Sequence, residues 1–471
     1  MTINIIFAIT IFLSNRLIET KVSWIIVIFS LPLVGILLFI LYGRTYRYRR
    51  YWKYYHKHYY FFDSFLQKSK IVLKDEYQNT WSLAFNLSNN YPYNLSKYWL
   101  FKDGIDKMIA LFNDLNNAKE FIHVEYFILS DGIILDIFID ILCHKAEKNL
   151  DVRLIYDGVG SFFNLTNIYI KRLKKSGVKV KCYVPPFLNI IGTSINYRNH
   201  KKIVVIDGKI GYFGGLNIAN EYASLTKKYG YWRDTHLKIK GESVNQLELN
   251  FLRDWSFLNE IPVSYYEKNP EEISKYLNHK VSKKSKNLIQ IIDNSPLFEI
   301  SNHDLLFNNL FLSAKKKIYI ITPYLILSNS LEKSLIIAKK SNIDIKIITP
   351  EIPDKKIVHA ITRMNYEKLI KNNIEIFEYQ KSFIHSKFIL IDDKIVFFGT
   401  SNLDYRSIFQ NYETMSLIKS KSLNQKLLKI FLEDLKQSKK IEFKNHFNNK
   451  SFWNIFFLVK YTVLKIVSPL M

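Results

Sequence analysis

Two copies of one short pattern of chemically active residues lie 185 positions apart in this chain. Each copy contains a histidine, a lysine two residues later and then an aspartate, followed by a glycine and an asparagine. The residues are His200, Lys202, Asp207, Gly214 and Asn217 in the first copy, and His385, Lys387, Asp392, Gly399 and Asn402 in the second. One such copy would arise by chance in roughly one chain of this length in 10⁴, so two copies in register indicate a functional duplication.

These residue types fit attack on a phosphodiester through a covalent intermediate. Covalent catalysis needs a nucleophile and also a proton donor for the leaving alkoxide, and two histidines can supply both. Lysine ammonium groups and asparagine amides stabilise phosphate oxygens. Each copy of the pattern supplies only one histidine, so the two copies must meet around one phosphate. The pattern predicts a phosphoryl-transfer enzyme.

The spacing within each copy predicts where the side chains point. His200 and Lys202 are two residues apart, so on a strand they share one face of the sheet. Asp207 lies an odd number of residues from His200, and a regular strand directs it away from the site. Asp207-Gly208-Lys209 is typical of a tight turn between two strands. We therefore expect Asp207, and Asp392 in the second copy, to stabilise the turn, although both belong to the catalytic signature.

A histidine nucleophile also needs an acid that orients its ring and stabilises the imidazolium. The candidates are Asp234 in GYWRDTH and Glu413 in NYE, each about thirty residues beyond the histidine of its own half. No cluster of carboxylates at metal-ligand spacing is visible, and paired lysines disfavour a divalent cation. The sequence therefore predicts a reaction that uses no metal and no cofactor.

The body of the chain is predicted to be two α/β lobes. Apolar strands alternate with helical stretches such as 102–117 and 328–341, a pattern typical of sheets flanked by helices. Three predicted strands of each half align with one another and precede the signature strands. We expect a first lobe at 101–278 and a second lobe at 288–471, separated by a Lys- and Ser-rich linker. No heptad array or other signal indicates an oligomeric state.

Residues 1–43 are predicted to form a membrane anchor. Residues 22–42 are almost wholly apolar and carry no charge, and twenty-one residues of helix cover roughly 31 Å, enough for the hydrocarbon core. Residues 3–13 are a second apolar run that covers only half a bilayer, so a short span and an interfacial segment are equally compatible.

A basic juxtamembrane and lead-in region is expected at 44–100. Six cations precede the next acidic residue, with tyrosines and Trp52 between them: Arg44, Arg47, Arg49, Arg50, Lys53 and Lys57. By the positive-inside rule this flank is cytoplasmic, with aromatic rings at the level of the lipid headgroups. The lobes that follow are then expected at the cytoplasmic face of the cell membrane.

The composition indicates an anionic partner, and the two cysteines indicate no disulfide framework. The chain has 471 residues and a formal net charge of +25, which suits acidic lipid or nucleic acid. Its two cysteines, Cys143 and Cys182, form neither a C-x-x-C motif nor a disulfide framework. The predicted anchor and its basic flank favour an anionic phospholipid membrane, and no nucleic acid is expected.

The paired signatures resemble those of the phospholipase D superfamily. The longer strings NYRNHKKIVVIDGKIGYFGGLNIANEY and HSKFILIDDKIVFFGTSNLDYRS are similar to bacterial cardiolipin synthases, and so are GYWRDTHLKI and the N-terminal apolar region. The resemblance covers essentially the whole chain. It implies two α/β lobes that meet at a pseudo-twofold interface, with one histidine from each lobe at a common site.

The resemblance also implies ping-pong chemistry with phosphatidylglycerol as the substrate. His200 would attack to form a phosphatidyl-histidine, and His385 would protonate the departing glycerol and then deprotonate a second phosphatidylglycerol. Asp234 and Glu413 match the family's histidine-orienting acids, and Asn217 and Asn402 its phosphate-binding amides. One departure is Gly215, which stands where the superfamily often has a serine that donates to phosphate.

Three other functions remain open from the sequence. The same scaffold supports lipid hydrolysis to phosphatidic acid or headgroup exchange with another acceptor, because acceptor choice depends on pocket shape and water exclusion. A nuclease is a weaker alternative that would also suit the positive charge. A membrane scaffold without activity is disfavoured by two intact signatures.

Overall fold

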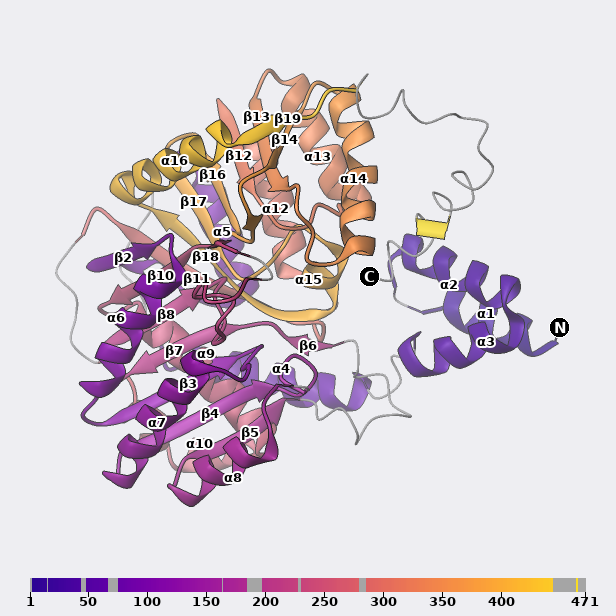
Figure 1. Cartoon of the computed structure of the whole chain (residues 1–471). Coiled ribbons are helices and arrows are strands. Elements are labelled where there is room, and N and C mark those ends of the chain that lie inside the picture. Colours follow the sequence, from indigo (N-terminus) through magenta and orange to yellow (C-terminus); the bar gives the residue numbers. More distant parts are fainter. Residues whose placement is uncertain are drawn as a thin grey trace.

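The chain folds into two α/β lobes and a small N-terminal helical unit (Figure 1). The computed structural model describes residues 2–14, 16–43, 48–66, 75–162, 164–183, 197–227, 230–278, 285–443 and 463–464, without the side chains of 41–42 and 48–54. Most of the predicted linker therefore lies outside the described residues. So do residues 444–462 and 465–471, at the C-terminal end of the predicted second lobe.

The first lobe is built on a seven-stranded sheet. In spatial order its strands are β2 (Lys97–Phe101), β10 (His236–Lys240), β8 (Ile210–Gly214), β7 (Lys202–Ile206), β3 (Phe121–Tyr126), β4 (Asp151–Asp157) and β5 (Lys179–Tyr183). Strands β3, β4 and β5 are parallel, whereas β7, β8, β10 and β2 run antiparallel to their neighbours. Strand β2 starts before residue 101, so the lobe begins slightly earlier than predicted.

The second lobe repeats this order and extends it. Its sheet runs β1 (Tyr93–Asn94), β11 (Leu288–Asn294), β18 (Asn411–Lys419), β17 (Ile395–Gly399), β16 (Phe388–Ile391), β12 (Lys317–Ile321), β13 (Asp344–Pro350), β14 (Glu375–Tyr379) and β19 (Ser438–Lys440). The strands from β11 to β14 occupy the same relative places as those from β2 to β5 in the first sheet. Phe213 and Phe398, which occupy equivalent positions, contact each other with ring centroids 5.7 Å apart. This contact places the pseudo-twofold axis between β8 and β17.

Helices cover the outer face of each sheet and also fill the layer between the sheets. The first sheet carries α6 (Gly104–Asn116), α7 (Ile133–Glu147) and α8 (Asn167–Lys175) on its outer face. The second carries α5 (Gln78–Ser88), α12 (Asn302–Ser313), α13 (Asn329–Lys340) and α14 (Lys356–Lys371). Between the sheets lie α4 (Tyr48–Asp63), α9 (Val244–Leu258) and α16 (Lys421–Lys436). The remaining helices of the lobes are α10 (Val263–Lys268), α11 (Glu271–Ser274) and α15 (Tyr405–Phe409).

Helix α4, within the predicted juxtamembrane and lead-in region, carries several aromatic side chains that lie in the protein core. Tyr55, Tyr59 and Phe62 are fully buried in the core between the lobes rather than placed among lipid headgroups. The guanidinium of Arg253 on α9 lies 4.3 Å from the ring centroid of Tyr59, which gives the buried ring a cation–π partner. Apolar and aromatic burial therefore overrides the sequence signal. The basic side chains from Arg44 to Lys53 lie outside the described set.

The N-terminal unit also differs from the prediction of one continuous helix over 22–42. Helix α1 (Thr2–Phe12) precedes α2 (Ile18–Ser30), after which the chain breaks and continues as α3 (Pro32–Leu38) and a π-helical turn, η1 (Phe39–Gly43). Pro32 has no N–H to continue the helical ladder, and its ring clashes with the preceding turn. A Cβ on Gly35 would lie 2.5 Å from the carbonyl oxygen of Val27, so α3 packs closely back on α2. No helix among the described residues has the length and apolar character that a membrane crossing needs.

The signature aspartates hold the hairpins that carry the other signature residues. Asp207 and Gly208 both adopt positive φ, as do Asp392 and Asp393, which gives each hairpin a two-residue turn. The Asp207 carboxylate accepts hydrogen bonds from the backbone N–H groups of Lys119, Glu120 and Phe121 at 2.8–3.2 Å. Its position agrees with the expectation from strand spacing that Asp207 stabilises the turn.

Asp392 repeats this arrangement in the second lobe. It accepts from the N–H groups of Lys315, Lys316 and Lys317 at 2.5–2.8 Å and from the hydroxyl of Tyr77 at 2.5 Å. Each aspartate thus ties the turn after the signature strand to the start of the neighbouring strand, β3 or β12. We therefore expect Asp392 to stabilise its turn in the same way as Asp207.

Replacement of Asp207 should therefore affect stability more than chemistry. Asp207→Ala leaves three backbone N–H groups without their acceptor, and we expect it to lower the free energy of unfolding by roughly 1–3 kcal/mol. Turnover per folded molecule should stay within a few-fold of wild type. Thermal unfolding in detergent, with the exposed Asp106→Ala as the matched control, measures the first quantity. A stable but inactive Asp207→Ala enzyme would contradict this assignment.

Candidate active site

His200 is positioned by a strand that crosses from the first lobe to the second. Strand β6 (Arg198–Asn199) pairs in parallel with the start of β18, and the His200 N–H donates to the carbonyl of Tyr412 at 2.9 Å. This backbone pairing brings the imidazole Nδ1 to 2.8 and 2.9 Å from the two carboxylate oxygens of Glu413. The first-lobe histidine therefore pairs with an acid of the second lobe.

His385 is positioned in the reciprocal way. Strand β15 (Phe383–Ile384) pairs in parallel with β9 (Trp232–Arg233) of the first lobe, and the His385 N–H donates to the carbonyl of Arg233 at 2.7 Å. The imidazole Nδ1 lies 2.8 Å from Oδ2 of Asp234. The sequence placed each acid with the histidine of its own half, and the structure corrects that assignment by exchanging the partners.

Burial and the paired acids set the protonation of the site. Burial lowers the pKa of His200 to about 4 against the opposing charge of Glu413, and burial together with Lys387 lowers the pKa of His385 to about 4. Burial alone would raise the pKa of Glu413, but His200 and Lys202 hold it at about 2. Both rings are therefore neutral near pH 7. With Nδ1–H donating to the carboxylate, each Nε2 carries the lone pair.

The two acids are held by different neighbours, which sequence reasoning did not identify. Thr400 donates its hydroxyl to Glu413 at 2.5 Å, and Asn411 donates an amide hydrogen at 3.1 Å. At the position equivalent to Thr400 the first lobe has Gly215, where a Cβ would lie 2.1 Å from the Asp234 carboxylate. The missing serine of the first lobe thus leaves room for Asp234. The pairing of Gly215 with Thr400 at equivalent positions was the only sequence signal.

The signature lysines are buried beside the histidines. Lys202 Nζ donates to the carbonyl of His200 at 2.6 Å, while Lys387 Nζ binds the carbonyl of His385 and lies 2.7 Å from its Nδ1. Burial lowers the pKa of Lys202 to about 7 and that of Lys387 to about 8. The charge of Lys387 also lowers the pKa of Lys202, so the two cations lie close enough to interact, and an anionic phosphate would neutralise them.

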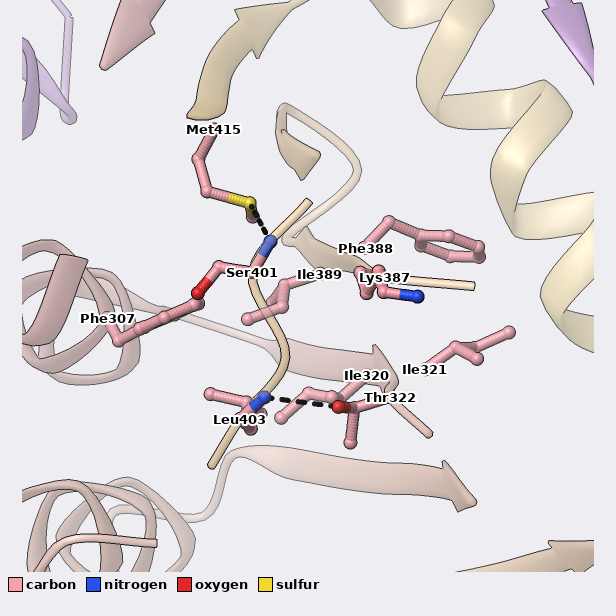
Figure 2. A pocket seen from close by; sticks show the side chains of 10 residues that line it. All are labelled: Phe307, Ile320, Ile321, Thr322, Lys387, Phe388, Ile389, Ser401, Leu403 and Met415. Atoms are coloured by element: carbon pink, nitrogen blue, oxygen red, sulfur yellow. Dashed lines mark hydrogen bonds between the residues drawn. The ribbon is translucent and has the colours of Figure 1, made fainter. Parts of the chain in front are cut away.

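Each signature asparagine lies on a loop that hydrogen bonds from its backbone N–H groups hold in place. Figure 2 shows the second loop, in which Ser401 N donates to Met415 Sδ at 3.4 Å and Leu403 N to Thr322 Oγ1 at 3.2 Å, one on each side of Asn402. The cavity behind this loop measures about 10 Å³, on the order of a single water, so the loop has little room to move.

The first loop is held similarly around Asn217. Leu216 N donates to His236 Nδ1 at 3.4 Å, and Ile218 N donates to the Ile128 carbonyl at 3.3 Å. Asn217 Oδ1 accepts from Ile128 N at 3.1 Å, which presents the amide nitrogen as the donor side. His236 therefore supports the loop that carries Asn217.

A buried polar network stands behind His200. Lys201 Nζ donates to Asn250 at 2.5 Å and to Asp254 at 2.6 Å on α9, and Asn250 contacts Asp293 and Thr414 of the second lobe. Lys201 follows His200 directly, and Thr414 follows Glu413. The network therefore couples both members of the first crossed pair to the same central helix.

The crossed pairing predicts how loss of one acid affects the two rings. Glu413→Gln removes the charge that fixes the Nδ1–H tautomer of His200, so kcat should fall on the order of 10³-fold or more. NMR of ¹⁵N-labelled histidine should show a changed tautomer at His200 and an unchanged His385. The reciprocal Asp234→Asn should alter His385 alone. A change at the histidine of the same half would contradict the exchanged pairs.

The lowered lysine pKa values predict an unusual alkaline limit. The rate constant kcat/KM should fall near pH 4, where protonation removes the Nε2 lone pair of His200, and again between pH 7 and 8, where the lysines lose their charge. Bound phosphate favours the ammonium form, so the alkaline limb of kcat should lie at higher pH. Lys202→Arg keeps its charge at all these values and should remove the limb near pH 7. An alkaline limb near pH 10 in the wild type would contradict this account.

Comparison with known proteins agrees with this geometry. Residues 111–255 and 308–435 match the family described as cardiolipin synthase, PLD-like domain, and residues 2–44 match the phospholipase D-nuclease N-terminal region. The chain is 34% identical to a cardiolipin synthase of Halalkalibacterium halodurans, over 100% of this chain and 93% of that protein. It is 33% identical to cardiolipin synthase 1 of Staphylococcus aureus, over 100% of this chain and 96% of that protein.

A solved structure supports the fold. The phosphatidylserine synthase of Haemophilus influenzae superposes with a TM-score of 0.61 at 16% identity, covering 83% of this chain and 100% of that one. This likeness concerns the two-lobed architecture, whereas the sequence matches extend from the N-terminal unit through both lobes. On this evidence the chain belongs to the cardiolipin synthase family of phospholipase D-like proteins.

Proposed function

We propose that this phosphatidyltransferase moves a phosphatidyl group from one phosphatidylglycerol to the terminal hydroxyl of another, producing cardiolipin and glycerol. The observation that carries the proposal is the pair of buried histidines, each oriented by a buried carboxylate of the opposite lobe. Two such rings beside two buried lysines suit a phosphodiester that is attacked and released in two successive displacements. Family membership supplies the substrate class.

In the first displacement we assign attack to His200, following the family resemblance. Its Nε2 lone pair forms a bond to phosphorus, and the ester bond to the headgroup glycerol breaks. His385 donates a proton to the departing glycerol oxygen. The free-enzyme pKa of His385 is about 4, and the bound anionic phosphate favours its protonated form. Lys202, Lys387 and the two signature asparagines stabilise the charge on the phosphate oxygens.

In the second displacement the terminal hydroxyl of another phosphatidylglycerol replaces histidine on phosphorus. His385, now neutral, accepts the hydroxyl proton, and the P–N bond to His200 breaks. Asp234 and Glu413 stabilise the imidazolium that each ring forms in turn. Every proton in this scheme moves through a residue of the chain, so the scheme uses no metal ion.

The N-terminal unit supports a lipid rather than a nucleic-acid substrate. Helices α1, α2 and α3 expose large aliphatic and aromatic side chains such as Ile6, Phe12, Leu33 and Leu37. Figure 1 places these helices to the side of the two lobes. Apolar surface of this extent is typical of a contact with lipid. With the basic residues that follow it, this unit would hold the lobes at the cytoplasmic face of the cell membrane.

Product analysis with purified full-length protein in phosphatidylglycerol vesicles containing EDTA tests the proposal. We expect cardiolipin and glycerol in equal amounts, and both should disappear in His200→Ala and His385→Ala. The exposed His144→Ala serves as the matched control and should retain activity. Phosphatidic acid as the main product would make the protein a hydrolase. Loss of activity in EDTA would refute the metal-independent scheme.

A further inference from the structure

Arg406 on α15 is an exception among the arginines whose side chains the structure describes. Six others form an ion pair with a carboxylate: Arg153 with Asp151, Arg172 with Asp140, Arg198 with Asp157, Arg233 with Asp434, Arg253 with Asp293, and Arg363 with Glu378. Arg16 binds the carbonyl of Gly43. The partly buried guanidinium of Arg406 makes no hydrogen bond or ion pair with any described residue.

The position of Arg406 is fixed relative to the candidate active site. Asp404 caps α15 by accepting from Ser407 N at 2.6 Å, and the same carboxylate accepts from the amide of Asn402 at 3.1 Å. Helix α15 is therefore attached to the loop that carries a phosphate-binding asparagine. The charges of Arg198 and Asp157 also act on Arg406, and Arg198 lies two residues before His200. Arg406 is therefore on a helix attached to the Asn402 loop, and it is close enough to Arg198, two residues before His200, for their charges to interact.

An unpaired charge at this place is costly. Burial lowers the pKa of Arg406 and the nearby Arg198 lowers it further, while Asp404 and Asp157 oppose the shift without forming an ion pair. A guanidinium nevertheless keeps its proton at any physiological pH. A partly buried cation without a partner is satisfied when an anion binds, and its planar fork suits phosphate oxygens.

We propose that Arg406 binds the phosphodiester of the acceptor lipid, a second phosphate subsite beside the catalytic one. This inference rests on the proposed function, in which the reaction brings two phosphodiesters together. In the product, one three-carbon glycerol unit links the two phosphates. The second phosphate therefore lies close to the reacting phosphate. Lys202, Lys387 and the signature asparagines are committed to the reacting phosphate. Arg406 supplies the cation that the second one lacks.

The pseudo-twofold symmetry is broken at this position in a way that suits one acceptor. The residue of the first lobe equivalent to Arg406 is Glu221, which would repel a phosphate. The reacting phosphate is shared by both lobes, but the acceptor approaches from one side only. Arg406 would attract the acceptor's phosphate on one side of the site, and Glu221 would repel it on the other. The acceptor lipid is therefore expected to bind in a single orientation.

Free glycerol separates acceptor binding from catalysis. In phosphatidylglycerol vesicles with radiolabelled glycerol, the phosphatidyl-histidine can react with a glycerol hydroxyl: the P–N bond breaks, a P–O bond forms, and the hydroxyl proton passes to the other histidine. This exchange uses the same nucleophile and the same reacting phosphate, but its acceptor carries no phosphate. Cardiolipin formation and label incorporation are measured in the same samples with full-length Arg406→Met, Arg406→Lys and the paired, exposed control Arg172→Met.

We expect Arg406→Met to lower cardiolipin formation about ten- to hundredfold relative to glycerol exchange. Arg406→Lys keeps the charge without the bidentate fork and should fall between Arg406→Met and the wild type. Arg172→Met should leave the ratio of the two reactions unchanged. An equal loss of both reactions in Arg406→Met, or no loss of either, would overturn the inference. A failure of the proposed function appears instead in the wild type, as glycerol exchange without cardiolipin.

Discussion

The hydrogen bond between each histidine and a carboxylate of the opposite lobe is the interaction on which the site depends. It fixes the tautomer of both rings, and it exists only because β6 pairs with β18 and β15 with β9 across the interface. A neutral imidazole with its lone pair on Nε2 would otherwise need a local acid in each half. The interface between the lobes is therefore part of the candidate active site, and its packing determines how the two rings are oriented.

Much of the fold and the members of the site could be predicted from the sequence. The repeated signature marked the histidines, lysines and asparagines, and the spacing of Asp207 from His200 correctly directed that aspartate to the turn. The exchange of Asp234 and Glu413 was not predictable, since separation along the chain carries no information about pairing across two similar halves. Thr400 was missed because a hydroxyl that supports an acid has no spacing signature of its own.

Residues 18–63 show where tertiary contacts override the structure that hydropathy predicts. A continuous apolar stretch predicted one helix over 22–42, but Pro32 and the close approach of Gly35 to α2 fold the chain back on itself. The aromatic residues of α4 suggested a membrane surface, yet Tyr55 and Tyr59 are core residues between the lobes. In both segments the apolar composition was recognised from the sequence, whereas the tertiary contacts that break the helix or bury the rings were not.

Crossed pairing also bears on how such a chain could arise and diverge. In a single ancestral half, the histidine would lack its orienting carboxylate unless a second copy bound to it. Two identical subunits would therefore have formed the first site. Fusion into one chain removed the need for identical halves. Asp234 could then differ from Glu413, Gly215 from Thr400 and Glu221 from Arg406 without disturbing the reciprocal pairs. A symmetric site thereby became free to treat its two lipids differently.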